Sequence, residues 1–191
     1  MKLILATQNK GKLEEFSQLA KGTCLKFTSL PENTKFPKEV GATFKANALI
    51  KAKYIFNLTG MPVLADDSGL EVDCLEGRPG IRSARYSREA TDQSNIDKLL
   101  DEMRGVKKSR RTARFKCSLI FIKDKLNNPL EAEGSLEGSI GTKRKGNWGF
   151  GYDSIFIVRD LGLHLAELEE RRKNRISHRA EAFRLLSKKI L

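Results

Sequence analysis

Two adjacent carboxylates stand where an α/β protein presents ligands. Asp66 and Asp67 directly follow a predicted strand over Met61–Ala65, and open α/β sheets bind ligands at the carboxyl ends of their strands. Carboxylate oxygens suit a hard cation such as magnesium. In an extended backbone the two side chains point to opposite sides, so we expect one to face a ligand while the other holds the turn. A turn-holding role for both is the alternative, and Glu39, in a proline-bounded loop, is a candidate further oxygen ligand.

A candidate anion site lies between a predicted strand and a predicted helix near the N-terminus. Backbone N–H groups at a helix start attract anions, a small residue allows close approach of a phosphate, and two lysines add positive charge. The segment is not a Walker A loop, because Leu13 replaces the hydroxyl residue that would reach magnesium. An ordinary turn with solvated lysines is the alternative. The residues are Thr7, Gln8, Asn9, Lys10, Gly11 and Lys12.

Aromatic residues set between glycines form a third candidate site. The segment Trp148–Asp153 contains Phe150, Gly151 and Tyr152. Glycines remove side-chain bulk beside an aromatic face, which leaves a slot where a flat base can stack. A bulged strand entry with aromatics in the core is the competing interpretation.

Hydrogen-bond donors gather near the C-terminus, in the segment Lys173–Arg179. His178 and Arg179 stand at the start of a predicted terminal helix, where several donors suit the acceptor atoms of a base or a phosphate. For His178, a capping or surface role is the alternative.

Hydrophobic periodicity predicts the elements that position these residues. Strands are expected over Lys2–Thr7, Leu25–Leu30 and Met61–Ala65, with helices over Gly11–Ala20 and Ala42–Asn57 between them. This alternation favours an α/β layer with some parallel pairing. The rest of the chain is predicted to contain strands or turns at Leu70–Leu75 and Ile81–Tyr86, a helix over Asp92–Arg104 capped by Thr91, strands over Thr112–Ile122, Pro129–Ile140 and Ser154–Val158, and a terminal helix capped by Ser177.

Composition and charge bound the class of protein. The chain has 191 residues, of which 39% are hydrophobic and 31% charged, as expected for a globular protein without membrane spans. No shift in composition divides it, so we predict a single domain over residues 1–191, located in the cytoplasm. The formal charge of +12 favours anionic partners. The run Arg104–Lys116 holds seven basic residues and no acid, and we favour a solvated surface over a nucleic-acid site there.

The chain is similar to the inosine/xanthosine triphosphate pyrophosphatase family, whose members hydrolyse non-standard purine nucleoside triphosphates. The ordered set of matching segments is highly specific and extends over nearly the whole chain. The segments are Leu5–Lys12, Gly41–Phe44 with Asn47 and Ala48, Ala65–Leu70, Pro79–Ile81 with Ser83–Tyr86, Gly149–Asp153, and Ile176–Arg179.

The resemblance implies an α/β fold with an elongated mixed twisted sheet, flanking helices and two lobes around a central cleft, usually in a homodimer. It also implies attack of water on the α-phosphorus of ITP, dITP or XTP, with magnesium, to release pyrophosphate and a nucleoside monophosphate. No membrane and no stable nucleic-acid partner are expected.

The site residues that the resemblance implies fall into three groups. Asp67 is the proton acceptor and a metal ligand, with Glu39 as a second metal ligand. Residues Thr7 to Lys12 hold the triphosphate, and Ser68 contacts the substrate. The base and sugar pocket comprises Phe150, Gly151, Tyr152, Asp153, Lys173, His178 and Arg179.

Three positions depart from the family pattern. Ala46 stands where an acid commonly precedes Asn47, Ser154 where proline is usual, and Ala180 where glycine is usual. None of these is a named catalytic position, so the departures bear on rate and selectivity.

Two rival functions are a basic nucleic-acid-binding protein without catalysis and a pyrophosphatase of modified pyrimidine nucleotides on a related fold.

Overall fold

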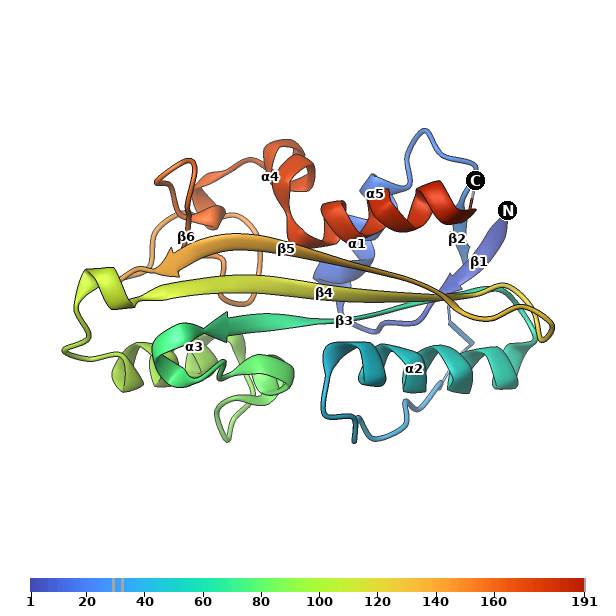
Figure 1. The fold of residues 1–191 in the computed structure, drawn as a ribbon, viewed down its shortest axis with the longest axis horizontal. Coiled ribbons are helices and arrows are strands. Elements are labelled where there is room, and N and C mark those ends of the chain that lie inside the picture. The colour runs from blue at the N-terminus through green and yellow to red at the C-terminus, as the bar shows by residue number, and fades with distance from the viewer. Residues whose placement is uncertain (29, 32, 191) are drawn as a thin grey trace. The chain divides into compact units, whose positions relative to one another are not determined.

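The computed structural model describes residues 1–28, 30–31 and 33–190. Among these residues, six strands form one mixed sheet in the order β2-β1-β3-β4-β5-β6 (Figure 1). β1 pairs in parallel with both β2 and β3, and β5 pairs antiparallel with β6. The strands are β1 (Lys2–Leu5), β2 (Lys26–Thr28), β3 (Val63–Val72), β4 (Thr112–Ile122), β5 (Leu130–Ile140) and β6 (Phe156–Val158). The predicted α/β class with a mixed sheet and flanking helices is therefore confirmed.

The helices form where local sequence signals begin and end them. Thr43 caps α2 by accepting a hydrogen bond from the Ala46 N–H, and Gly60 ends the helix in the left-handed conformation at φ 66°. Thr91 and Ser94 form a reciprocal capping box at the start of α3. The α-helices are α1 (Lys10–Leu19), α2 (Phe44–Thr59), α3 (Asp92–Glu102), α4 (Glu170–Ile176) and α5 (His178–Ile190).

The chain divides into two compact units. Unit 1 comprises Met1–Asp67, Cys117–Gly134 and Arg179–Leu191, and unit 2 comprises Ser68–Lys116 and Ser135–His178. The prediction of one domain over the whole chain is not tested by this division and stays a prediction. None of the helices among the described residues is long and apolar enough to cross a membrane.

In unit 1, helices cover both faces of the strands (Figure 1). One face packs against α1 and α5, in a core that includes Phe16, Phe121 and Phe183. The other packs against α2, in a core that includes Ile55 and Ile120. Two layers of helix around the sheet therefore bury the strands of this unit from both sides.

Unit 2 has a core of its own. Leu99 of α3 and Met103, which follows that helix, pack in one cluster with Leu70 and Val72 of β3 and with Phe156 of β6. Gly138 of β5 is required for this packing, because a Cβ there would lie 2.3 Å from the carbonyl oxygen of Ile157.

The structure corrects three predictions of local structure. β3 runs unbroken from Val63 to Val72, so the predicted acidic turn is part of a strand that joins the two strands predicted on either side of it, while Asp73–Leu75 forms a 3-10 helix. The segment predicted as a strand or turn at Ile81–Tyr86 is a 3-10 helix over Gly80–Arg85. The short helix α4 was not predicted, and Ser177 separates it from α5. Ser29, in the predicted second strand, lies outside the described residues.

Candidate active site

The loop between β1 and α1 has the geometry of a strand-to-helix junction, as predicted. The Asn9 side chain caps α1 by accepting the Lys12 N–H at 3.0 Å, and the Thr7 hydroxyl accepts the Asn9 N–H at 3.2 Å. Lys10 and Gly11 occupy the first turn of the helix. Side-chain oxygens thus fix the course of the loop. The N-terminus of a ten-residue helix adds a positive electrostatic potential, which favours anions.

Gln8 lies exposed in this loop but has a partner in another segment. Its Nε2 atom donates a 2.8 Å hydrogen bond to the carbonyl oxygen of Thr34. Thr34 is buried and belongs to the segment between β2 and α2. The hydrogen bond therefore ties the predicted anion loop to the segment that carries Glu39.

Asp66 is the centre of a buried charge network in unit 1. Its Oδ2 atom lies 3.0 Å from the Lys12 Nζ and 3.9 Å from the Arg179 Nε, and Arg179 also pairs with Glu15 at 2.9 Å. Burial alone would raise the pKa of Asp66, but Lys12, Lys51 and Arg179 outweigh it and lower the pKa to about 2. Asp66 is therefore ionised at neutral pH and holds Lys12 in place.

Asp67 belongs to a second charge group, on the opposite side of β3. The Lys51 Nζ lies 3.2 Å from the Asp67 Oδ1 and 3.0 Å from the Glu39 Oε1. Burial raises the pKa of Asp67, while Lys51 counteracts that rise. For Lys51, burial lowers the pKa, but Asp66, Asp67 and Glu39 together raise it. Adjacent aspartates on one strand thus have separate cationic partners, as the alternation of an extended strand requires.

The predicted turn-holding role for the aspartates is wrong. Both lie inside β3 rather than in a turn after it, and both form ion pairs with lysine or arginine side chains. The strand tolerates two buried carboxylates because each is paired with a cation from a helix that packs on its own side.

The oxygen donors of Asp67 and Glu39 fit a magnesium ion. The Asp67 Oδ2 atom is buried and has no hydrogen-bond partner among the described residues, and both carboxylates already surround a single cationic nitrogen. Within the described residues, no three His, Cys, Asp or Glu side chains form a ready metal cage. This arrangement agrees with magnesium, which commonly takes one or two carboxylates together with water and substrate phosphates.

Phe150, Asp153 and Lys173 come together in unit 2. The Asp153 Oδ2 accepts hydrogen bonds from the Phe150 N–H at 3.0 Å and from the Lys173 Nζ at 2.7 Å. The same Nζ lies 4.7 Å from the centre of the Phe150 ring. Gly149 has φ +83°, and a Cβ there would lie 2.1 Å from the Asp153 carboxylate. The glycine is therefore needed for the carboxylate to hold this turn.

The other two members of the predicted aromatic slot differ in their exposure. Tyr152 is buried in the core of unit 2, where its hydroxyl donates to the carbonyl oxygen of Ser83 at 2.9 Å. The Gly151 N–H donates to the Asp92 carboxylate at 2.7 Å. Phe150 is half-buried and Trp148 is 57% exposed, so of the two aromatic residues predicted to bind the base, Phe150 rather than Tyr152 is accessible for stacking.

His178 and Arg179 are neighbours in sequence but serve different groups. The His178 ring is 1% exposed and stacks on Phe115 at 4.9 Å, with an angle of 10° between the planes, within unit 2. Arg179 belongs to unit 1 and joins the network of Asp66 and Glu15.

Among the other predicted site residues, Ser68 is half-buried on β3, directly after Asp67. His178 starts α5, as predicted.

Sequence reasoning missed three buried polar residues of unit 1, namely Glu15, Asn47 and Lys51. Glu15 is 4% exposed, Asn47 0% and Lys51 7%. Asn47 and Lys51 share the buried face of α2 with Ala48 and Ala52, where polar residues are unusual unless they have partners. A polar residue within a predicted apolar stripe is the signal that would have found them.

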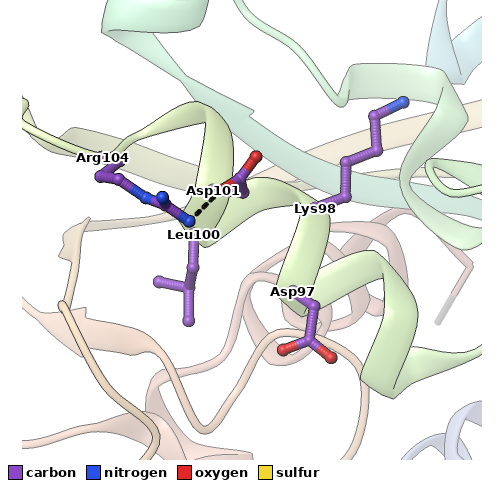
Figure 2. A pocket seen from close by; sticks show the side chains of 5 residues that line it. All are labelled: Asp97, Lys98, Leu100, Asp101 and Arg104. Carbon is purple, nitrogen blue, oxygen red and sulfur yellow. Dashed lines mark hydrogen bonds and ion pairs between the residues drawn. The ribbon is translucent and has the colours of Figure 1, made fainter.

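The hollow on the surface of α3 involves none of these residues. It is lined by Asp97, Lys98, Leu100, Asp101 and Arg104, and Figure 2 shows these side chains on α3 and on the turn that follows it. Two of them, Asp101 and Arg104, pair with each other. Because both acidic and basic side chains line the hollow, its charge does not favour any one class of ligand.

Comparisons with known proteins agree over almost the whole chain. A sequence model of the Ham1 family matches residues 3–189. The dITP/XTP pyrophosphatase of Methylococcus capsulatus is 45% identical, with 99% of this chain and 96% of the relative covered. The dITP/XTP pyrophosphatase of Bacillus subtilis is also 45% identical, with 97% and 94% covered.

Solved structures give the same result. A HAM1 protein from Coxiella burnetii has a TM-score of 0.89 and 38% identity, and the match covers 100% of this chain and 98% of that one. The Staphylococcus aureus Ham1 protein has a TM-score of 0.87 and 33% identity at the same coverage.

Proposed function

Because this chain belongs to the Ham1 family, we propose that it hydrolyses non-standard purine nucleoside triphosphates, namely ITP, dITP and XTP, to the nucleoside monophosphate and pyrophosphate. The observation that carries the proposal is the pair of buried charge groups on β3. Asp66 holds a lysine of the anion loop on one side, and Asp67 shares Lys51 with Glu39 on the other. In this proposal, phosphate binding and water activation depend on these two consecutive aspartates.

The loop from Thr7 to Lys12 binds the triphosphate in this proposal. The exposed ammonium group of Lys10 and the backbone at the start of α1 supply positive potential. Lys12 is held by Asp66 with its side chain 14% exposed, so it contributes a fixed charge rather than a mobile one. Ser68 follows the catalytic aspartate and contacts the substrate. Preorganised charge of this kind stabilises the pyrophosphate as it leaves.

Asp67 accepts the proton of the attacking water in this proposal. Burial raises the pKa of Asp67, and a carboxylate with a raised pKa is a stronger base. Asp67 and Glu39 would hold a magnesium ion, which supplies charge neutralisation at the phosphates when bound. Lys51 keeps the two carboxylates together through its ion pairs with both.

The Phe150 segment and a set of hydrogen-bond donors recognise the base in this proposal. The Phe150 ring stacks on the base, and Gly151, Tyr152 and Asp153 form the framework of its turn. Lys173, His178 and Arg179 are the candidate donors for the base and sugar. Inosine and xanthosine present an oxygen acceptor at C6, whereas adenine presents an amino donor, and a buried donor left unpaired discriminates strongly. Rejection of guanine depends on its 2-amino group.

The two rival functions predict different behaviour. A nucleic-acid-binding protein would use the run Arg104–Lys116, but Arg111 is buried there with its guanidinium on three carbonyl oxygens, and Arg114 forms ion pairs with Glu71, Asp73 and Glu137. These contacts favour a structural role for the run. A pyrimidine-nucleotide pyrophosphatase would differ from the proposed enzyme only in the base that it accepts.

We further propose that the chain forms one functional domain, is located in the cytoplasm and assembles as a homodimer.

A panel of nucleoside triphosphates tests the proposed function. With magnesium, the purified protein should release pyrophosphate from ITP, dITP and XTP at much higher kcat/KM than from ATP, GTP or pyrimidine nucleotides. Orthophosphate as the first product, or a preference for a pyrimidine, would contradict the proposal.

The variant Asp67→Asn tests the proposed base. It should reduce kcat by about 100-fold or more, the usual contribution of a positioned general base, while the Kd of a non-hydrolysable ITP analogue changes far less. The matched variant is Asp160→Asn, an exposed aspartate outside the site, which should behave as the wild type. An unchanged kcat in Asp67→Asn would remove this residue from its role.

A further inference from the structure

The segment of residues 33–43, which we call the Glu39 loop, is attached to its surroundings at three points. Near its start, the Thr34 carbonyl oxygen accepts the 2.8 Å hydrogen bond from Gln8. In its middle, Glu39 pairs with Lys51 at 3.0 Å. Near its end, the Gly41 N–H donates a 2.8 Å hydrogen bond to the Asn47 side-chain oxygen. All of these residues belong to unit 1.

The attachment at Gly41 is tight as well as hydrogen-bonded. Asn47 is 0% exposed on the first turns of α2. A Cβ added at Gly41 would lie 2.6 Å from the Asn47 Oδ1 and 2.8 Å from the Ala46 Cβ. Because real contacts are never that close, any side chain at position 41 forces the loop away from α2. Glu39 is only two residues from this point.

The attachment at Thr34 has a different character. Thr34 is 8% exposed and its hydroxyl donates to the Pro31 carbonyl oxygen at 2.6 Å, so this end of the loop is locally ordered. The Gln8 amide then connects it to the loop between β1 and α1. The two uncharged attachments lie on either side of Glu39, and neither uses the carboxylates or Lys51.

We infer that Gln8 and Asn47 are positioning residues that hold the Glu39 carboxylate within reach of Asp67, and that Gln8 couples the triphosphate loop to the metal-binding loop. This inference rests on the proposed function and reassigns Gln8, which the sequence predicts as a direct substrate contact. A ligand side chain on a loop must be fixed by its neighbours before a cation binds, because otherwise the ordering cost reduces affinity. Outer partners of metal ligands typically contribute 10-fold or more to metal affinity.

The variant Gln8→Met tests the inference, because it keeps the side-chain length and removes the donor. In the nucleotide-free and metal-free protein, amide hydrogen exchange over residues 33–43 should become faster. With a non-hydrolysable α,β-imido analogue of ITP, the Mn²⁺ concentration for half-saturation, followed by electron paramagnetic resonance, should rise about 10-fold. The Kd of the analogue measured in EDTA should stay close to the wild-type value.

Two further variants separate positioning from direct binding. Gly41→Ala displaces the other end of the loop, so it should reproduce the faster exchange and the weaker Mn²⁺ binding without touching the triphosphate loop. Lys10→Met is the contrasting variant in the same loop as Gln8, and it should raise the Kd of the analogue in EDTA while hydrogen exchange over residues 33–43 stays unchanged.

The outcomes distinguish failure of the inference from failure of the proposed function. Unchanged exchange in Gln8→Met, or faster exchange with unaltered Mn²⁺ binding, would overturn the inference. A raised Kd of the analogue in EDTA as the only effect would restore Gln8 as a substrate contact. If the wild type neither binds Mn²⁺ with the analogue nor hydrolyses ITP, the proposed function fails and the metal role of the loop fails with it, whatever the exchange rates are.

Discussion

At the scale of single residues, each buried charge of unit 1 has an opposite charge beside it. Asp66 has Lys12 and Arg179, Glu15 has Arg179, and Asp67 has Lys51. An isolated buried ion is very costly, whereas paired ions persist at a modest cost. The lysines and carboxylates are consequently held in fixed positions before any substrate arrives, which is the condition for electrostatic catalysis.

The low pKa of Asp66 predicts a specific dependence of stability on pH. Its pKa is lowered from 3.8 to about 2 in the folded protein, so its contribution to the free energy of unfolding is present above pH 3.8 and is lost as the pH falls toward 2. Asp66→Asn should lower that free energy by roughly 3 kcal/mol at pH 7, because it leaves cations unpaired. The difference from the wild type should shrink below pH 3.8.

Urea denaturation between pH 7 and pH 2.5 measures this effect. Asp160→Asn, at an exposed position, serves as the control and should follow the wild type throughout. A difference between Asp66→Asn and the wild type that stays constant down to the lowest pH would contradict the assigned pKa.

At the scale of elements, two pieces of secondary structure bring the proposed catalytic groups together. β3 presents Asp66 and Asp67 on alternate sides. α2 supplies Asn47 and Lys51, which lie one helical turn apart and therefore on one face. Since the Glu39 loop leads directly into α2, the N-terminus of this helix sets where the loop ends.

The N-cap of α2 should therefore be measurable in stability. Thr43→Ala removes the oxygen that accepts the Ala46 N–H at 3.1 Å, and it should cost about 1 kcal/mol in the free energy of unfolding. Thr43→Ser keeps an equivalent oxygen and should retain most of the stability. Urea denaturation of both variants checks this, and an equal loss in both would show that the hydroxyl is not the source.

At the scale of the whole molecule, the basic residues behind the net charge of +12 have several separate roles. Lys12, Lys51 and Arg179 balance buried carboxylates in unit 1. Arg111 supports unit 2 through backbone carbonyl groups. Within the basic run, Lys107, Lys108 and Arg110 are exposed. A high net charge is thus compatible with a nucleotide enzyme and is not by itself a sign of nucleic-acid binding.

Neutralising the exposed part of the basic run separates these alternatives. The triple variant Lys107→Gln, Lys108→Gln and Arg110→Gln should change kcat/KM for ITP by less than about twofold at about 0.15 M salt, because exposed surface charges are largely screened at that ionic strength. A steeply salt-dependent affinity of the wild type for oligonucleotides that disappears in the triple variant would instead favour nucleic-acid binding.

Much of the framework follows from local sequence signals. The strand over Thr112–Ile122 has the predicted bounds, and α2 ends at Gly60, where glycine adopts a left-handed conformation that other residues disfavour. The acidic segment was predicted less well, because adjacent aspartates have a low strand propensity and are typical of turns. Lysines from two different helices neutralise them and allow the strand to continue.

Neighbouring residues and their order were enough to predict the alternation of strands and helices, the strand-to-helix junction before α1 and the family. The tertiary structure alone decided which charges meet. Lys51 joins Glu39 and Asp67, Arg179 pairs with Glu15 and lies near Asp66, and Gln8 donates a hydrogen bond to Thr34. Such contacts depend on distances between residues far apart in the chain, which are fixed only when the helices pack on the sheet.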